Sequence, residues 1–164
     1  MIIWTIEAAS KSKSIDRIIL STDDEEIAEL CKNTGIEIPF MRPTELAQDN
    51  SLAIDNYLYT IDRLNSASQQ NISKFIVLLP TTPLRSSEDI DGAVKLFREK
   101  QADSVLSCVA MDHPLDWAFT ISSFGAIERE DHLMKSNPLN RQASEVSYIA
   151  NGGVYVFRYS LLKE

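Results

Sequence analysis

A rigid turn that presents hydroxyl groups and a guanidinium lies near the middle of the chain. The apolar run Phe75–Leu79 leads into Pro80–Pro83, which reads P-T-T-P, and Arg85 follows two residues later. The prolines stiffen the backbone without supplying N–H groups, while Thr81 and Thr82 offer hydroxyls and Arg85 offers a forked donor. Arginines gathered at such a turn could bind a small polyanionic ligand. The alternative is a stiff strand-to-helix connection in which Arg85 pairs with a nearby carboxylate.

Other chemistry finds little support in the sequence. No Ser-His-Asp or Cys-His arrangement is convincing, and neither His113 nor His132 has a cysteine or carboxylate at the spacing of a metal site. We expect Cys31 and Cys108 to be small core residues, because both lie within apolar patterns. Two such cysteines favour a reduced, cytoplasmic setting.

Composition limits the class of protein. With 164 residues and 44% hydrophobic content, the chain can bury one core, and we expect a single domain. The formal net charge of −8 disfavours nucleic acid as a partner, because a surface that follows phosphates must be basic. No apolar run reaches the roughly 18 residues of a membrane span, and the first residues do not read as a signal peptide.

The elements that would position the turn alternate along the chain. Helical periodicity is clearest over Ile54–Leu64, and capping boxes are expected at Thr22–Glu25 and Ser86–Asp89. The expected strands cover residues 17–21, 37–41, 74–79 and 104–110. This alternation predicts a mainly parallel α/β sheet, in which ligands bind beyond the carboxyl ends of the strands.

The rhythm changes after Met111. Trp117–Ser122 is expected to be a strand, followed by a turn at Ser123–Gly125, and a buried strand resumes over Asn151–Phe157. We interpret residues 112–148, approximately, as a hairpin-like arm that either covers a site or reaches a partner subunit.

Several short motifs are spread across nearly the whole chain. They are T-I-E-A-A at Thr5–Ala9, S-T-D-D-E-E-I-A at Ser21–Ala28, R-P-T-E-L-A-Q-D at Arg42–Asp49, L-L-P-T-T-P-L-R-S at Leu78–Ser86, D-S-V-L-S at Asp103–Ser107, N-R-Q at Asn140–Gln142 and N-G-G-V-Y-V at Asn151–Val156. Taken together, these motifs resemble those of the CMP-acylneuraminate synthetases, also called acylneuraminate cytidylyltransferases. They keep the order and spacing of that family, and R-P-T-E-L-A-Q-D and P-T-T-P-L-R are the most specific.

The resemblance implies a Rossmann-like fold of the nucleotide-diphospho-sugar transferase type, with helices on both faces of the sheet. It implies attack of the anomeric hydroxyl of a sialic-type nonulosonic acid on the α-phosphorus of CTP, with Mg²⁺ assisting. The products would be a CMP-sugar and pyrophosphate. The partners would be CTP, an acidic nine-carbon sugar and a second copy of the chain, held in a homodimer through the arm.

Residue by residue, the resemblance assigns part of the chain to the nucleotide. Arg42 matches an arginine that contacts the nucleotide; alternatively it is a surface arginine paired with Glu45. Ser51 falls where the family has another contact, although a helix cap would explain it equally well. Thr81 and Arg85 of the rigid turn are also assigned to nucleotide binding.

Other residues are assigned to the sugar acid. Arg141 is the expected catalytic residue, binding carboxylate or phosphate oxygens with its planar fork, and Gln142 beside it would bind the sugar. The alternative for this pair is a solvated loop. Asn151 and Gly152 match the N-G before the returning strand, where Asn151 either contacts the sugar or serves only the turn.

The chain also departs from the family pattern. The family begins with a strand and a basic Gly-rich loop and ends with a metal-binding Asp-x-Asp element. Neither is found in residues 1–164, so no metal ligand is assigned and low CTP turnover is expected of this chain alone. Leu79 and Ile149 replace common glutamine and arginine residues, which leaves the particular nonulosonic acid open. The alternatives are another sugar nucleotidyltransferase and a non-catalytic remnant of the family.

Overall fold

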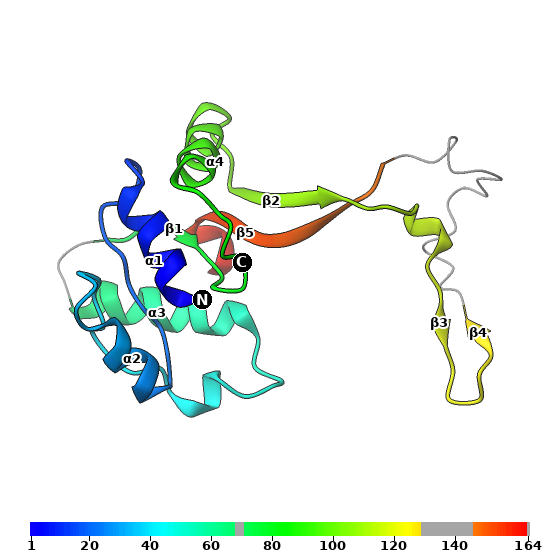
Figure 1. Cartoon of the computed structure of the whole chain (residues 1–164), viewed down its shortest axis with the longest axis horizontal. Helices are drawn as coiled ribbons and strands as arrows, with labels where there is room; N and C mark the ends of the chain where they lie inside the picture. The colour runs from blue at the N-terminus through cyan, green and yellow to red at the C-terminus, as the bar shows by residue number, and fades with distance from the viewer. Residues whose placement is uncertain (68–70, 129–145, 164) are drawn as a thin grey trace. The chain divides into compact units, whose positions relative to one another are not determined.

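The computed structural model describes residues 1–67, 71–128 and 146–163 (Figure 1). The chain divides into two compact units. The first combines Met1–Ser107 with Gly152–Glu164, and the second is Cys108–Asn151. The predicted arm falls within the second unit; that it forms part of a single domain stays a prediction.

Four α-helices of the first unit follow from their sequence patterns. Ser86 caps α4 through the predicted capping box with Asp89, and α3 covers the predicted amphipathic segment. The start of α2 differs from the prediction. Asp24, not Thr22, is its N-cap, because the Asp24 carboxylate accepts the N–H groups of the first turn, while Thr22 accepts from Asp24 itself. The helices are α1 Ile2–Lys11, α2 Glu25–Cys31, α3 Ala53–Ala67 and α4 Ser87–Glu99.

The sheet has three strands in the order β1-β5-β2. Strand β1 is Lys74–Val77, β2 is Ser104–Ala110 as predicted, and β5 is Tyr148–Arg158. Strand β1 pairs antiparallel with β5, with Val77 opposite Tyr155. This pair departs from the expected mainly parallel sheet, and mixed sheets of this kind are common.

The two other expected strands are reduced to a single parallel bridge. Ile19 pairs with Glu37, and the Leu20 N–H donates to the Glu37 carbonyl at 2.9 Å. The remaining residues of 17–21 and 37–41 are not assigned to strands. Parallel pairing is therefore present at this bridge, and a mainly parallel sheet stays a prediction.

Helices contact both faces of the β1–β5 pair. Successive side chains of a strand point to opposite faces, so each strand supplies contacts to both helix layers. On one face Ile76 packs against a core cluster made of β5, α1 and α4 side chains. On the other face Tyr57 of α3 lies 6.1 Å from Phe75 and 6.4 Å from Phe157, measured between ring centroids. The core cluster consists of Ala8, Ile90, Val94, Phe97, Val154 and Val156.

The second unit contains a short hairpin. Strands β3 (Thr120–Ile121) and β4 (Ile127–Glu128) pair antiparallel, and Gly125 turns the chain with φ +80°. The expected strand over Trp117–Ser122 is thus only two residues long. Trp117 ends a 3-10 helix that follows Pro114 instead. Cys108 is exposed rather than buried, which corrects its expected core position, whereas Cys31 is fully buried.

The capping box of α4 offers a test of this fold. Replacing Ser86 with alanine removes the acceptor of the Asp89 N–H, and should lower the free energy of unfolding by about 1 kcal/mol in urea titrations. Ser87→Ala is the matched control, because the Ser87 hydroxyl donates to the neighbouring Glu88 side chain and does not cap the helix, and it should change stability by less than about 0.5 kcal/mol. Equal effects of the two substitutions would contradict the assigned cap.

Candidate functional site

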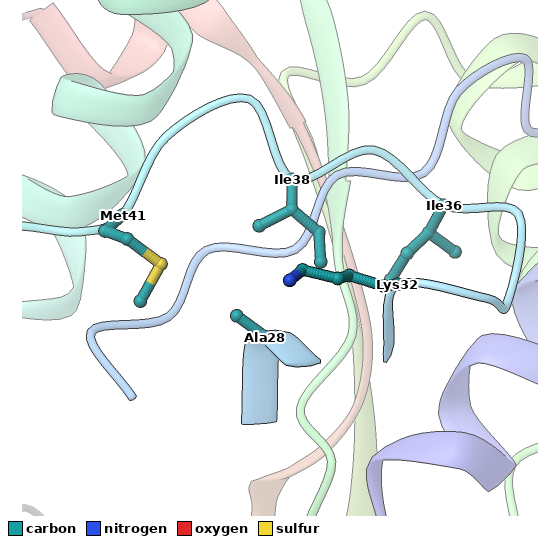
Figure 2. A pocket seen from close by; sticks show the side chains of 5 residues that line it. All are labelled: Ala28, Lys32, Ile36, Ile38 and Met41. Carbon is teal, nitrogen blue, oxygen red and sulfur yellow. The ribbon is translucent and has the colours of Figure 1, made fainter. Parts of the chain in front are cut away.

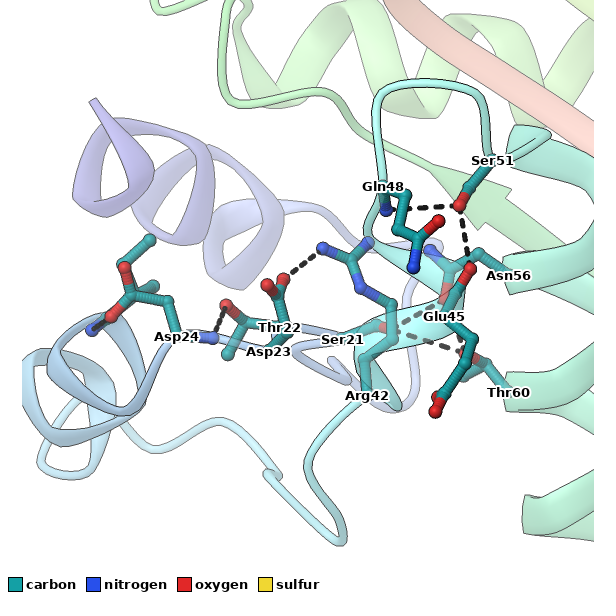
Figure 3. Close-up of polar contacts among 11 residues, drawn as sticks. Ser21, Thr22, Asp23, Asp24, Arg42, Glu45, Gln48, Ser51, Asn56 and Thr60 are labelled. Atoms are coloured by element: carbon teal, nitrogen blue, oxygen red, sulfur yellow. Dashed lines mark hydrogen bonds and ion pairs between the residues drawn. The ribbon is translucent and has the colours of Figure 1, made fainter.

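The first group of polar contacts surrounds Arg42 (Figure 3). The Arg42 N–H donates to the Thr22 carbonyl at 2.8 Å, so the two segments joined by the Ile19–Glu37 bridge stay side by side up to this point. The guanidinium donates from Nη2 to Asp23 Oδ1 at 2.5 Å. Its carboxylate partner is thus Asp23 rather than the Glu45 considered from the sequence.

The Arg42–Asp23 pair is half-buried. The side chains are 23% and 36% exposed, respectively. The hydrogen bond from Arg42 lowers the pKa of Asp23, with a smaller contribution from the charge of the arginine. Among the described residues, the buried Nε of Arg42 has no hydrogen-bond partner. Because both side chains of the pair keep part of their surface in solvent, another anion can reach the guanidinium and compete with the Asp23 carboxylate.

Ser51 fixes the loop that precedes α3. Its hydroxyl donates to the Glu45 carbonyl at 2.8 Å and accepts the Gln48 N–H at 3.1 Å. The hydroxyl therefore closes the loop near Arg42 (Figure 3). Its contact with a nucleotide stays a prediction.

A cluster of three polar side chains beside this loop was missed from the sequence. The Ser21 hydroxyl donates to Asn56 Oδ1 at 3.0 Å, and Thr60 lies 3.4 Å from both side chains. Asn56 and Thr60 are one turn apart on α3, where polar residues usually face solvent, so spacing alone gave no signal.

The P-T-T-P segment forms two consecutive turns. The Thr82 N–H donates to the Leu79 carbonyl, and the Arg85 N–H donates to the Thr82 carbonyl, each at 3.4 Å. Each turn has a proline at its second position, where a fixed φ near −65° is favoured. Thr81 is exposed at the third position of the first turn.

Arg85 points inward from these turns and is 7% exposed. Its Nε donates to the Gly153 carbonyl, and Nη2 donates to the carbonyls of Leu79 and, at 3.5 Å, Gly152. These acceptors correct the interpretation of Arg85 as the partner of a carboxylate. Burial lowers the pKa of Arg85, although the charge of Asp89 opposes this shift. Within the described part of the chain, Nη1 has no partner.

Gly152 lies against the same turns. Its φ of +74° is unfavourable for other residues, and a Cβ there would lie 3.2 Å from Leu79 Cδ1 and 3.4 Å from Thr82 Oγ1. Its N–H donates to the Tyr155 hydroxyl at 2.9 Å. Asn151 is exposed and belongs to the second unit.

Two predicted site residues, Arg141 and Gln142, lie outside the described residues. No group of three His, Cys, Asp or Glu side chains is placed to hold a metal ion in the part that the structure describes. Nor is any described helix both long enough and apolar enough to cross a bilayer.

A hollow lined by other residues is shown in Figure 2. It is lined by Ala28 of α2, by Lys32 at the C-terminal cap of that helix, and by Ile36, Ile38 and Met41. The Lys32 ammonium pairs with Glu29 of α2. No predicted site residue lines this hollow, so it adds nothing to the candidate site.

Comparison with known proteins identifies relatives of the chain. A family model described as cytidylyltransferase matches residues 1–159. The chain is 32% identical to post-translational flagellin modification protein B of Campylobacter coli, over 99% of this chain and 68% of that protein. It is 28% identical to the CMP-N,N'-diacetyllegionaminic acid synthase of Legionella pneumophila, over 95% of this chain and 66% of that protein.

A solved structure supports the α/β fold. CMP:2-keto-3-deoxy-manno-octonic acid synthetase, in complex with CTP, matches with a TM-score of 0.68 at 15% identity, over 99% of this chain and 64% of that one. At this identity the likeness concerns the fold alone. The chain spans about two thirds of the length of these three proteins.

The Arg42–Asp23 contact predicts a titration. Arg42→Gln should raise the pKa of Asp23 toward the ordinary value of about 3.9, measured by NMR of the side-chain carboxyl. Because the folded-state pKa is lowered, the contribution of the pair to stability is present above the unfolded pKa and lost as pH falls through the folded one. Arg17→Gln is the control, because Arg17 pairs with Glu37 and should leave Asp23 unchanged. An unmoved Asp23 titration in Arg42→Gln would contradict the contact.

The crowding at Gly152 predicts a second result. Gly152→Ala should lower the free energy of unfolding by more than Gly35→Ala does, because both glycines have positive φ but a Cβ at Gly35 meets nothing within 4 Å. The shared backbone cost is about 1–2 kcal/mol. Urea titrations of both variants measure the difference, and equal losses would show that Leu79 and Thr82 yield freely to the new methyl group.

Proposed function

Because the chain belongs to the cytidylyltransferase family, we propose that it activates an acidic nine-carbon sugar with CTP, giving a CMP-sugar and pyrophosphate. The family match over residues 1–159 carries this proposal. The nonulosonic class of sugar is supported by the Legionella pneumophila relative, whose name is that of a CMP-N,N'-diacetyllegionaminic acid synthase.

On the nucleotide side, Arg42 is the residue we assign to phosphate oxygens. Its guanidinium is half-buried and already bound to one anionic partner, Asp23. Phosphate oxygens would replace that carboxylate or bind the guanidinium beside it, because the planar fork of arginine can donate to carboxylate and phosphate alike. Thr81 is exposed on a turn that two prolines stiffen, so its hydroxyl can meet a ligand without a large loss of backbone entropy.

On the sugar side, we assign Arg141 and Gln142 to the sugar acid and the developing charge, and Asn151 and Gly152 to positioning the sugar. In the reaction, the anomeric hydroxyl attacks the α-phosphorus and pyrophosphate leaves. Catalysis of this kind depends on orientation and on neutralising charge rather than on a protein nucleophile. Mg²⁺ would supply part of that neutralisation. The described residues do not form a site for it, so no step is assigned to a metal held by them.

The second unit supports a proposal about assembly. Its hairpin carries exposed apolar side chains, with Ile121 66%, Phe124 96% and Ile127 65% exposed. Apolar residues gathered in this way mark contact surfaces more often than free ones. We assign them to a homodimer interface made by the arm.

Two further features complete the proposal. The parallel bridge between Ile19 and Glu37 supports a mainly parallel sheet, in which the antiparallel β1–β5 pair is a local reversal. A cytoplasmic setting fits Cys31 and Cys108, which are both free thiols.

The proposal is tested by pyrophosphate release from CTP in the presence of a panel of nonulosonic acids. The longest reading frame that contains residues 1–164 should be used, because the chain spans about two thirds of its relatives. Arg42→Ala should raise KM for CTP about tenfold, and Arg141→Lys should lower kcat/KM for the sugar acid by about one to two decades. Arg17→Ala is the matched control, since Arg17 pairs with Glu37 and is assigned to neither substrate. Unchanged constants in both site variants would refute these assignments.

A further inference from the structure

We propose that Arg85 is a positioning residue that fastens Gly152 and Gly153 of strand β5 to the P-T-T-P turns that follow β1, rather than a residue that binds the nucleotide. The effect on substrates rests on the proposed function, whereas the fastening itself does not. The P-T-T-P turns carry Thr81 and the β5 segment carries Gly152, and these two residues are assigned to different substrates. Arg85 would therefore fix how the sugar side of the site is held relative to the nucleotide side.

The contacts of Arg85 carry this inference. Its guanidinium reaches the carbonyl of Leu79, before the first proline, and the carbonyls of Gly152 and Gly153 in strand β5. Gly152 and Gly153 are 67 and 68 residues away from Arg85 along the chain. Two nitrogens are thus committed to main-chain carbonyls, and at 7% exposure the side chain has little surface left for a ligand.

Gly152 completes the fastening from the other side. Without a side chain, its backbone lies close enough to Leu79 and Thr82 for its carbonyl to accept from Arg85. Its N–H is held by the Tyr155 hydroxyl of the same strand. Both backbone polar groups of this glycine are therefore hydrogen-bonded, the carbonyl to Arg85 and the N–H to Tyr155.

A lysine at position 85 could not make the same set of hydrogen bonds. Arg85 spans carbonyls of two separate segments with different nitrogens of one planar group, whereas the lysine ammonium is a single point on a flexible stem. Burial also disfavours a charged lysine more readily, because its ordinary pKa of about 10.4 lies nearer neutrality. Arg85→Lys should therefore weaken the fastening without abolishing it, and Arg85→Gln should weaken it further.

Amide hydrogen exchange tests the fastening directly. In Arg85→Gln, exchange at residues 152–155 and 82–85 should accelerate about tenfold or more relative to wild type, with Arg85→Lys intermediate. The α3 amides serve as an internal reference, and Arg17→Gln as a matched loss of an arginine elsewhere. If Arg85→Gln does not fold, Arg85→Lys against wild type gives the same comparison. Unchanged exchange at residues 152–155 and 82–85 would overturn the proposal.

Kinetics separates positioning from nucleotide binding. In Arg85→Lys, KM for the sugar acid should rise about tenfold while KM for CTP stays within about twofold. A merely smaller fraction of folded protein would lower apparent kcat and leave both KM values unchanged. A rise confined to KM for CTP would overturn the proposal and return Arg85 to the nucleotide. If wild type transfers no cytidylyl group, the proposed function fails. The exchange experiment still decides whether Arg85 fastens the β5 segment to the P-T-T-P turns.

Discussion

The antiparallel pairing of β1 with β5 is the constraint on which the rest of the first unit depends. Its register, with Ile76 opposite Val156 and Phe75 opposite Phe157, decides which side chains each face offers to the helices. A slip of one residue would exchange the aliphatic face for the aromatic one and leave neither helix layer matched. The same register brings the end of β1 to the glycines of β5. Packing of the core and geometry of the turns therefore have one cause.

Two arginines near strand ends show how burial separates roles that look alike in a sequence. Arg42 keeps part of its side chain in solvent and meets a carboxylate, so its partner can be exchanged at little cost. Arg85 is enclosed and meets main-chain carbonyls, which are fixed acceptors. Removing a buried charge from its acceptors leaves unsatisfied polar groups on both sides, a much larger penalty. A ligand can thus compete for Arg42 far more easily than for Arg85.

Local signals in the sequence predicted much of the fold. The spacing of apolar residues located α3, the Ser86–Asp89 box located the start of α4, and the strand expected over residues 104–110 matches β2. What failed depended on distant partners. Strand direction at β1 is set by the chain that returns after residue 147, and no nearby residue encodes it. For the site, the sequence singled out Arg42 and Arg85 for nucleotide binding, which stays a prediction, but it did not indicate their acceptors, which lie 19 and up to 68 residues away.

The two turns explain why two prolines enclose two threonines ahead of Arg85. Each proline fixes the second position of a turn, so the backbone reverses its direction twice within seven residues, 79–85. That path leaves Thr81 exposed and carries Arg85 back under the strand end, where it is buried. One arginine thus secures the scaffold through main-chain carbonyls, and the charge of Asp89 favours its charged form. The anionic substrates would then meet a surface whose shape is already set, and neutralising their charge falls to other side chains.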